Sequence, residues 1–130
     1  MTTDTAVPLG AFEEMVEFLQ QELADRRLTG YLLGHAGDGN LHVILPWRNA
    51  AEWAAVEAYH GAAVRKSLEL GGTASGEHGV GMGKRGFLEG EHGEGAVAVM
   101  RMMKQMLDPR GILNPSKVLP PQNVTVANGE

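Results

Sequence analysis

The stretch Gly30-Tyr-Leu-Leu-Gly-His-Ala-Gly-Asp-Gly-Asn-Leu-His-Val-Ile-Leu45 decides the fold of this 130-residue chain. Two short apolar or alternating runs, residues 30–35 and 41–45, flank the turn-forming sequence Gly37-Asp-Gly-Asn40. Such runs on both sides of turn residues predict a β-hairpin. Pro46 ends the second run, because proline lacks the backbone N–H that a ladder needs. We therefore expect an antiparallel sheet built on this hairpin.

Two amphipathic helices flank the hairpin in the sequence. The first is predicted from residue 12 to about residue 27, where apolar residues recur at helical spacing: Phe12, Met15, Val16, Leu19 and Leu23. Asn49 can cap a second helix, because its side chain can accept a hydrogen bond from a free backbone N–H of the first turn. This helix ends near residue 70 at the pair Gly71-Gly72.

Short strands on either side of these helices complete the sheet. Residues 3–7 are predicted to form a first strand and residues 73–75 a fourth. The order is then βαββαβ, the ferredoxin-like arrangement, in which an antiparallel sheet carries both helices on one face. The expected fold class is therefore α+β, and a chain of this length can bury one compact core.

A further helical pattern and a polar tail follow. Residues 96–107 predict a last amphipathic helix, which stops at Asp108-Pro-Arg-Gly111. The helical spacing of its methionines favours packing over a soft-metal surface. Residues 120–130 are rich in proline and polar residues, and we expect them to be disordered.

Composition excludes several classes of function. The sequence has no cysteine, which excludes a disulfide framework, a thiolate nucleophile and a cysteine-based metal site. The 11 basic and 16 acidic residues give a net charge of -5, and no basic cluster suits nucleic acid. No stretch reaches the roughly 20 apolar residues of a membrane span, and residues 1–8 do not resemble a secretory signal. The cytoplasm is the expected location.

The predicted hairpin places two histidines on one face of the sheet. A four-residue loop of residues 37–40 would put His35 opposite His42, with Cβ atoms about 4.5–5.5 Å apart. Two imidazoles at that separation can converge on one ion at a metal–nitrogen distance of about 2.0–2.1 Å. The alternative is that the histidines are cross-strand hydrogen-bonding partners. Asp38 could compete as a ligand, but its loop position favours a role in the turn.

The glycine-flanked sequence Gly76-Glu77-His78-Gly79 offers a third ligand. Because adjacent side chains usually diverge, we expect Glu77 and His78 to have different roles. Glu77 is the better metal ligand, since a carboxylate lowers the net charge of a divalent site. His78 then faces the substrate as acid or base, because a neutral imidazole near pH 7 suits proton abstraction. The alternative for this tetrapeptide, taken alone, is a solvated loop.

Three further residues, His92, His60 and Lys84, have side chains that could serve in a site. His92 lies in a similar tetrapeptide but is expected in a turn, and His60 is expected to be a packing histidine on or beside the apolar face of the second helix. Lys84 belongs to the glycine-rich residues 79–86, which match neither a P-loop nor a dinucleotide fingerprint. Lys84 either neutralises a substrate carboxylate or lies on a solvated surface, and it stays a candidate substrate-binding residue.

Three motifs together resemble one protein family: Gly34-His-Ala-Gly-Asp-Gly-Asn-Leu-His42, Ser75-Gly-Glu-His-Gly-Val-Gly81 and Leu107-Asp-Pro-Arg-Gly-Ile-Leu-Asn-Pro-Ser-Lys117. Their order and spacing closely resemble the C-terminal region of the FAD-linked oxidases. This family includes D-lactate dehydrogenases, the glycolate oxidase flavin subunit and D-2-hydroxyglutarate dehydrogenase. The resemblance implies that residues 1–119 are the C-terminal portion of a cap domain, which binds substrate.

The resemblance also implies an activity and residue roles. The intact enzyme would use FAD to oxidise a D-2-hydroxy acid to the 2-oxo acid. In metal-dependent members, residues matching His35, His42 and Glu77 bind a divalent ion, often zinc or manganese. The residue matching His78 removes the hydroxyl proton of the substrate.

The resemblance also suggests roles for two asparagines, and the sequence departs from the family pattern at one position. Asn40 resembles a substrate-contacting position, and Asn114 lies in a closing motif that approaches the flavin. That motif reads Asn-Pro-Ser-Lys here, where Asn-Pro-Gly-Lys is usual, so the backbone at Ser116 is less free.

The expected partners follow from what this sequence does not contain. The flavin-binding segments and the basic residues that clamp the substrate carboxylate lie outside it. We therefore expect the chain alone to be inactive, because the flavin supplies the electron sink. The expected partners are a flavin-binding domain or subunit and a small 2-hydroxy acid, and a homo-oligomer is possible. The alternative function is a stand-alone metal- or carboxylate-binding module without redox activity.

Overall fold

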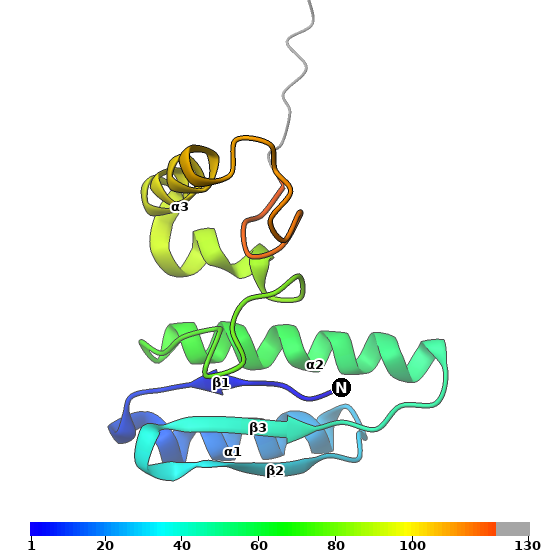
Figure 1. Ribbon diagram of the computed structural model, residues 1–130. Coiled ribbons are helices and arrows are strands. Elements are labelled where there is room, and N and C mark those ends of the chain that lie inside the picture. The colour runs from blue at the N-terminus through cyan, green and yellow to red at the C-terminus, as the bar shows by residue number, and fades with distance from the viewer. Residues whose placement is uncertain (122–130) are drawn as a thin grey trace, which may run out of the picture. The chain divides into compact units, whose positions relative to one another are not determined.

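The computed structural model describes residues 1–121, and it divides into two compact units (Figure 1). The first unit is Met1–Gly79, and the second begins at Val80. The chain thus has two units where one compact core was expected. They separate in the glycine-rich stretch of residues 79–86, which has few side chains that could join a common core. The tail predicted to be disordered lies mostly outside the described residues.

The first unit contains a three-stranded antiparallel sheet in the order β1-β3-β2. Its strands are Thr5–Ala6 (β1), Tyr31–His35 (β2) and Asn40–Ile44 (β3). The hairpin and the α+β class are therefore confirmed. The predicted fourth strand, residues 73–75, is reduced to a single bridge between Ala6 and Thr73. Pairing stops there because the chain bends at Ala74, directly after the bridge, and turns over residues 76–78.

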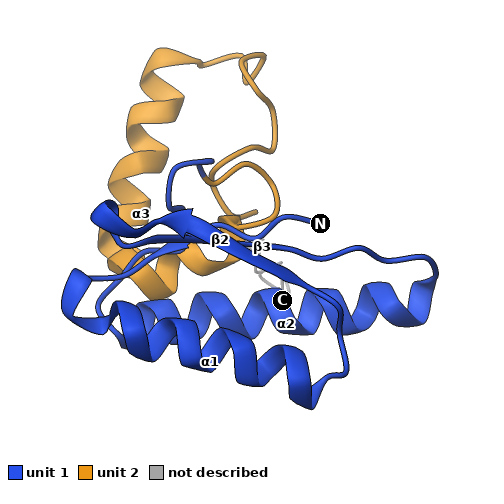
Figure 2. Ribbon diagram, turned by 90° about the horizontal axis from the view of Figure 1, so that it is seen from below, with its two compact units in different colours: residues 1–79 blue, residues 80–130 orange. Residues whose placement is uncertain are grey.

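Both helices of the first unit cover one face of the sheet (Figure 2). A short 3-10 turn, η1 (Leu9–Ala11), leads into α1 (Phe12–Asp25), and α2 (Ala50–Glu69) follows β3. Asn49 caps α2 as predicted, since its Oδ1 accepts a hydrogen bond from the backbone N–H of Glu52. The core between sheet and helices contains Val7, Met15, Leu19, Leu41, Val43, Leu45, Val56, Tyr59 and Ala63.

Alternation along β3 separates the core from the opposite face of the sheet. Leu41 and Val43 belong to the core under the helices. Because side chains alternate along a strand, Asn40 and His42 lie on the other face. This second face, which no helix of the first unit covers, carries the predicted site and is called the open face below.

The register of the hairpin differs from the predicted one. Leu33 pairs with His42, whereas His35 pairs with Asn40. The turn occupies residues 36–39, one position earlier than predicted. Because the change of pairing is two residues and side chains alternate with period two, His35 and His42 still share the open face. The conclusion that they lie on one face is therefore correct, although the pairing that led to it is wrong.

The earlier turn is set by Gly39. The 3-10 turn η2 (Ala36–Asp38) ends at Gly39, which has a left-handed φ of 70°. A Cβ atom at this position would overlap the carbonyl oxygen of Val7. Glycine is therefore required both by backbone conformation and by the close approach of another segment.

The second unit is built on one kinked helix. A 3-10 turn, η3 (Arg85–Phe87), leads into α3 (Leu88–Leu107). The backbone of Gly93 is non-helical, with φ 80° and ψ 155°, so the preceding His92 lies at a break, consistent with the predicted turn.

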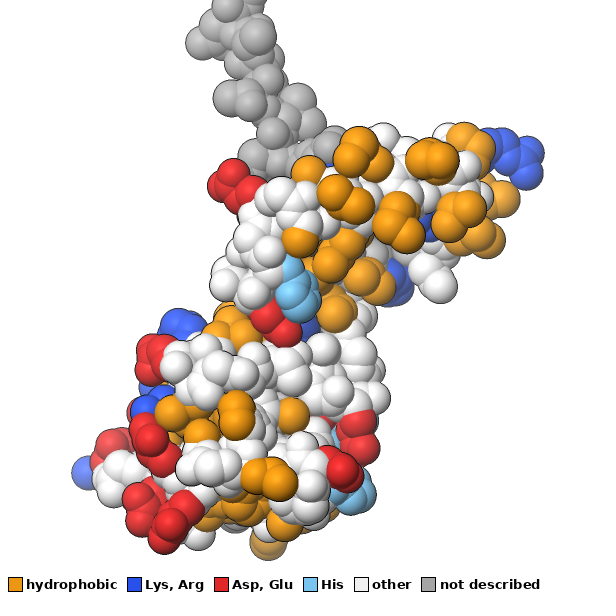
Figure 3. Space-filling model, turned by 90° about the vertical axis from the view of Figure 1, so that its left-hand side faces the viewer, with side chains coloured by type: hydrophobic (Ala, Val, Ile, Leu, Met, Phe, Trp, Pro, Cys, Tyr) orange, Lys and Arg blue, Asp and Glu red, His pale blue; other side chains and the backbone are white. Residues whose placement is uncertain are grey.

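Hydrophobic side chains gather on the surface of the second unit (Figure 3). Met102, Met103 and Met106 of α3 are 55%, 57% and 81% exposed. Within the part of the chain that the structure describes, these three methionines therefore do not pack as predicted. Among the described residues, no helix combines the length and apolar character needed to cross a bilayer.

Candidate metal and substrate site

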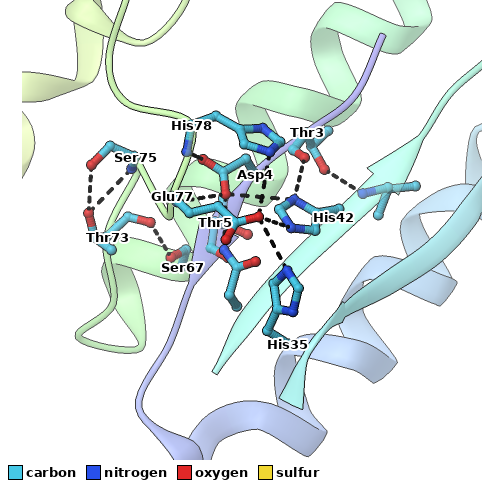
Figure 4. A network of polar contacts seen from close by, with 12 residues as sticks. Thr3, Asp4, Thr5, His35, His42, Ser67, Thr73, Ser75, Glu77 and His78 are labelled. Atoms are coloured by element: carbon cyan, nitrogen blue, oxygen red, sulfur yellow. Dashed lines mark hydrogen bonds and ion pairs between the residues drawn. The ribbon is translucent and has the colours of Figure 1, made fainter. Parts of the chain in front are cut away.

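Three imidazoles of the open face meet at the carboxylate of Glu77 (Figure 4). Its Oε1 atom is 3.0 Å from Nε2 of His42, 3.3 Å from Nε2 of His35 and 3.6 Å from Nε2 of His78. His35 ends β2, His42 lies within β3, and the other two residues belong to the loop after the Thr73 bridge. The structure thus brings together all four residues predicted as metal ligands and base, and we call them the histidine cluster.

The donor set of His35, His42 and Glu77 fits a divalent metal ion. One donor atom from each lies within 4.8 Å of the others. The two nitrogen–oxygen separations of 3.0 and 3.3 Å match the edges of a tetrahedron or octahedron with bonds of about 2.1 Å, which measure about 3.0–3.4 Å. A set of two imidazoles and one carboxylate leaves coordination positions for a substrate.

His42 is held with its Nε2 directed at Glu77. Its side chain is only 6% exposed, and its Nδ1 lies 3.3 Å from the carbonyl oxygen of Thr3. In the tautomer protonated at Nδ1, this contact is a hydrogen bond and Nε2 keeps its lone pair. Metal-binding histidines are commonly oriented in this way by a backbone carbonyl.

Asp4 anchors the loop that carries the cluster. Its buried carboxylate accepts hydrogen bonds of 3.0 Å from the backbone N–H groups of both Glu77 and His78. It also accepts one of 2.9 Å from Nδ2 of Asn40. A second possible donor set consists of Asp4, His42 and His78. Because the carboxylate of Asp4 already accepts three hydrogen bonds, its geometry favours an anchoring role over metal ligation.

Sequence reasoning missed Asp4. The neighbouring side chains of Thr3, Asp4 and Thr5 are all 1% exposed, although each residue is polar. One signal was present, since aspartate is depleted in strands and here lies inside a predicted one. A buried carboxylate needs donors, and the glycine-rich loop around Glu77 supplies backbone N–H groups.

Two close approaches of the chain to itself hold this loop. The hydroxyl of Ser67 lies 2.9 Å from the carbonyl oxygen of Ala6 and 3.0 Å from that of Thr73. A Cβ atom at Gly76 would overlap Oδ1 of Asp4. The glycine cluster was expected to allow close approach to a ligand. At Gly76 it allows close approach to a buried carboxylate instead.

His78 lies beside His42 as well as beside Glu77. The two imidazole rings stack with centroids 4.8 Å apart and an interplanar angle of 13°. The side chain of His78 is 51% exposed, so solvent or a ligand can reach it. Glu77 and His78 were expected to diverge. Both instead reach toward His42, and the backbone N–H groups of both bind the carboxylate of Asp4.

Asn40 is buried beside the cluster, with 4% exposure. Its Nδ2 donates to Oδ1 of Asp4 and, at 3.2 Å, to the carbonyl oxygen of Thr5. Its Oδ1 is buried and makes no hydrogen bond with any described residue. The amide therefore has a clear structural role, and contact with a substrate through Oδ1 stays a prediction.

The remaining predicted residues, Lys84 and Asn114, lie in the second unit. Lys84 is largely buried, with 9% exposure, so it is not the freely solvated side chain that the sequence allowed. Asn114 has a left-handed φ of 46°, and its carbonyl oxygen accepts a hydrogen bond from the backbone N–H of Lys117. Their roles toward a substrate or flavin stay predictions.

Asp108 organises the turn that leads to Asn114. Its carboxylate accepts hydrogen bonds from the backbone N–H groups of Ile112 and Leu113, at 3.0 and 2.9 Å. A hydrogen bond from Lys104 lowers the pKa of the Asp108 carboxyl, and these two backbone donors lower it further. The sequence predicted Asp108 only as the end of a helix.

Residues 1–118 match the family described as FAD linked oxidases, C-terminal domain. The chain belongs to this family. Among the FAD-linked oxidases, it is 43% identical over 117 residues to the mitochondrial D-lactate dehydrogenase (cytochrome) of Kluyveromyces lactis. That alignment covers 90% of this chain and 20% of the relative.

Two further FAD-linked oxidases show how broad the similarity is. The glycolate oxidase subunit GlcD of Bacillus subtilis is 38% identical over 117 residues, covering 88% of this chain and 25% of that protein. The mitochondrial D-2-hydroxyglutarate dehydrogenase of Danio rerio is 36% identical over 121 residues, covering 90% and 22%. The chain thus spans about a fifth to a quarter of the length of these relatives.

Proposed function

We propose that this chain is the substrate- and metal-binding part of an FAD-dependent dehydrogenase that oxidises a D-2-hydroxy acid to the 2-oxo acid. The observation that carries the proposal is the convergence of three imidazoles on Glu77. It occurs in a chain whose relatives are named D-lactate dehydrogenase, glycolate oxidase subunit and D-2-hydroxyglutarate dehydrogenase. The substrate is an acid of the lactate, glycolate or 2-hydroxyglutarate type.

In this proposal His35, His42 and Glu77 hold a divalent metal ion, zinc or manganese. Such an ion supplies Lewis-acid polarisation and a fixed orientation for the hydroxyl and carboxylate of the substrate. The chain contributes a preorganised donor set. The carbonyl of Thr3 orients His42, and the carboxylate of Asp4 fixes the backbone that carries Glu77.

His78 acts as the base in this proposal and accepts the hydroxyl proton of the substrate at Nε2. The separation of 3.6 Å between its Nε2 and Oε1 of Glu77 supports this role, because an oxygen atom bound beside that carboxylate would lie within its reach. Stacking on His42 restricts the ring and keeps Nε2 directed at the site. FAD, bound by another part of the enzyme, supplies the acceptor for the hydride from C2. Loss of that hydride and of the hydroxyl proton leaves the 2-oxo acid.

The proposal assigns three more residues and the partners of the chain. Asn40 and Lys84 contact the substrate, and Asn114 approaches the flavin. The chain needs a flavin-binding domain or subunit and is inactive alone, because its own side chains include no hydride acceptor. A homo-oligomer and a cytoplasmic location are further predictions, although several relatives are named mitochondrial.

Assembly with the flavin-binding part of a D-lactate dehydrogenase relative tests the proposal. Addition of a D-2-hydroxy acid should bleach the flavin absorbance. A His78→Gln variant should slow the bleaching by about 10²–10⁴-fold, as expected when a general base is lost, with little change in substrate affinity. His92→Gln is the matched control, because His92 lies at the kink of α3, and it should leave the rate unchanged.

The same assembly distinguishes the alternative function. A stand-alone metal- or carboxylate-binding module predicts bound metal and no flavin reduction with any D-2-hydroxy acid. Reduction that is equally fast in the His78→Gln variant would contradict the role of His78 while leaving the class of reaction intact.

A further inference from the structure

Leu33 lies beside the histidine cluster on the open face of the sheet. It pairs directly with His42, and His35 is the next residue of β2 on the same face. Leu33 is 47% exposed although it is a large apolar residue. The next pair on this face, Tyr31 and Ile44, is also apolar and exposed. An apolar surface therefore begins directly next to the proposed metal donors.

No lysine or arginine occurs in the segments that build the site. Residues 1–8, 31–45 and 71–79 contain only acidic side chains and histidines as titratable side chains besides Tyr31. The basic residues of the first unit lie on the helices or next to them: Arg26, Arg27, Arg48, Arg65 and Lys66. Two of them are paired there, Arg26 with Glu22 and Lys66 with Glu14. These segments therefore offer no lysine or arginine side chain as a partner for a second carboxylate on a ligand.

We propose that Leu33 contacts the C2 substituent of the substrate and makes this site select 2-hydroxy acids whose substituent is uncharged. The inference rests on the proposed function, because the metal donors fix where the hydroxyl and the C1 carboxylate lie. It favours acids of the lactate type over acids of the 2-hydroxyglutarate type.

Two effects act in the same direction at Leu33. An alkyl substituent covers apolar surface of Leu33, and each buried methylene strengthens binding by about fourfold. A terminal carboxylate against Leu33 loses water without gaining a hydrogen-bond donor from that side chain.

A matched pair of ligands tests this inference on the full chain loaded with Mn²⁺. (2R)-2-hydroxypentanoate and (2R)-2-hydroxyglutarate have the same number of carbon atoms and differ only in a terminal methyl or carboxylate group. Paramagnetic relaxation of the ligand protons gives a dissociation constant for each. The measured quantity is the ratio of the hydroxyglutarate constant to the hydroxypentanoate constant.

Three variants locate the effect. Leu33→Lys should lower the ratio by about two- to fivefold, the range of one exposed charge pair. Leu33→Ala should weaken hydroxypentanoate binding and leave hydroxyglutarate binding nearly unchanged. Ala58→Lys adds the same charge on an exposed position of α2, which packs against the other face of the sheet, and should leave the ratio unchanged.

The outcomes separate this inference from the proposed function. A wild-type ratio above one that falls in Leu33→Lys and in Leu33→Ala but not in Ala58→Lys supports it. Bound Mn²⁺ with a ratio at or below one, or with equal changes in Leu33→Lys and Ala58→Lys, overturns the role of Leu33 and leaves the metal site intact. Failure of the chain to bind Mn²⁺ overturns the metal site and the inference together.

Discussion

The carboxylate of Asp4 accepts a hydrogen bond of 3.0 Å from the backbone N–H of Glu77, a residue 73 positions later in the chain. The same carboxylate accepts a second backbone hydrogen bond from the next residue, His78. The first strand region therefore fixes the loop that carries the proposed ligand and the proposed base. The position of Glu77 depends on a buried charge that has no direct contact with a substrate in the proposed mechanism.

Replacement of Asp4 by asparagine should weaken the site without removing a ligand. The carboxylate accepts three hydrogen bonds, and an amide would direct its N–H₂ group at one of these donors. We expect a loss of about 1–3 kcal/mol in unfolding free energy. Metal affinity should fall by about 10–100-fold, as it does when groups that orient ligands are removed.

Urea unfolding and competition with a chelator measure the two effects of Asp4→Asn. Asp38→Asn is the control, because Asp38 is an exposed residue of the turn η2 and removes the same charge. Equal metal affinities in Asp4→Asn and wild type would show that Asp4 does not position Glu77.

Replacement of Gly76 by alanine should displace the carboxylate of Asp4 and so disturb its hydrogen bonds to the loop of Glu77 and His78. Gly76 has a φ of 37°, and a Cβ atom would overlap Oδ1 of Asp4. The positive φ alone should lower the unfolding free energy of an alanine variant by about 1–2 kcal/mol. Displacement of Asp4 should also weaken metal binding. Gly83→Ala is the matched control, because nothing lies within 4 Å of a Cβ there. A Gly76→Ala variant with wild-type thermal stability would rule out this packing.

Tyr59 should contribute to stability through one buried hydrogen bond. Its hydroxyl donates to the carbonyl oxygen of Leu19 at 3.2 Å, which ties α2 to α1. Tyr59→Phe should lower the unfolding free energy by about 0.5–1.5 kcal/mol at neutral pH, measured by urea unfolding.

The same residue predicts how stability depends on alkaline pH. Burial, with a smaller effect from Glu22, raises the pKa of Tyr59 in the folded chain. The contribution is therefore fully present below the pKa of an unfolded tyrosine, about 10, and is lost as the pH rises above it. The Tyr59→Phe variant should lose less stability than wild type between about pH 10 and 11. Parallel curves for the two proteins would contradict this.

Asp108 predicts the opposite pH dependence in the second unit. The hydrogen bond from Lys104 lowers the pKa of its carboxyl in the folded chain. Its stabilising effect is therefore fully present above the ordinary pKa of an aspartate, about 3.9, and is lost as the pH falls below that value through the lowered pKa of the folded chain. The protection of the Ile112 and Leu113 amides, which donate to this carboxylate, against hydrogen exchange should fall in that range, relative to the intrinsic exchange rate at each pH. In Asp108→Asn their protection should already be low at neutral pH, and unchanged protection would contradict the role.

The helices and the hairpin could be predicted because their signals are local. Asn49 caps α2 through a hydrogen bond to a residue three positions away, and Met15 and Leu19 are buried at helical spacing. The register of the hairpin could not be predicted in this way. The register depends on Gly39. This position requires glycine because the carbonyl oxygen of Val7, 32 residues earlier in the chain, lies where a Cβ atom would be.

The proposed ligands and base could be predicted, whereas their support could not. Histidine and glutamate are common metal ligands and bases, so His35, His42, Glu77 and His78 could be recognised as candidates. The alternation of side chains along a strand predicts that His35 and His42 share one face. The role of Asp4 requires knowing that residues 3–5 lie beside β3 and below the glycine-rich loop. The contact between Asp4 and the backbone of Glu77 joins residues 73 positions apart, so no local sequence pattern predicts it.

X-ray absorption at the zinc edge tests the central claim most directly. The full chain loaded with one equivalent of Zn²⁺ should show two imidazole nitrogen atoms at about 2.0–2.1 Å and carboxylate oxygen at about 2.0–2.2 Å. His42→Ala should lose the imidazole scattering of one ligand, whereas His92→Ala should give the wild-type spectrum. Zinc bound without imidazole scattering, or a spectrum that His42→Ala leaves unchanged, would contradict the claim that His35, His42 and Glu77 hold the metal.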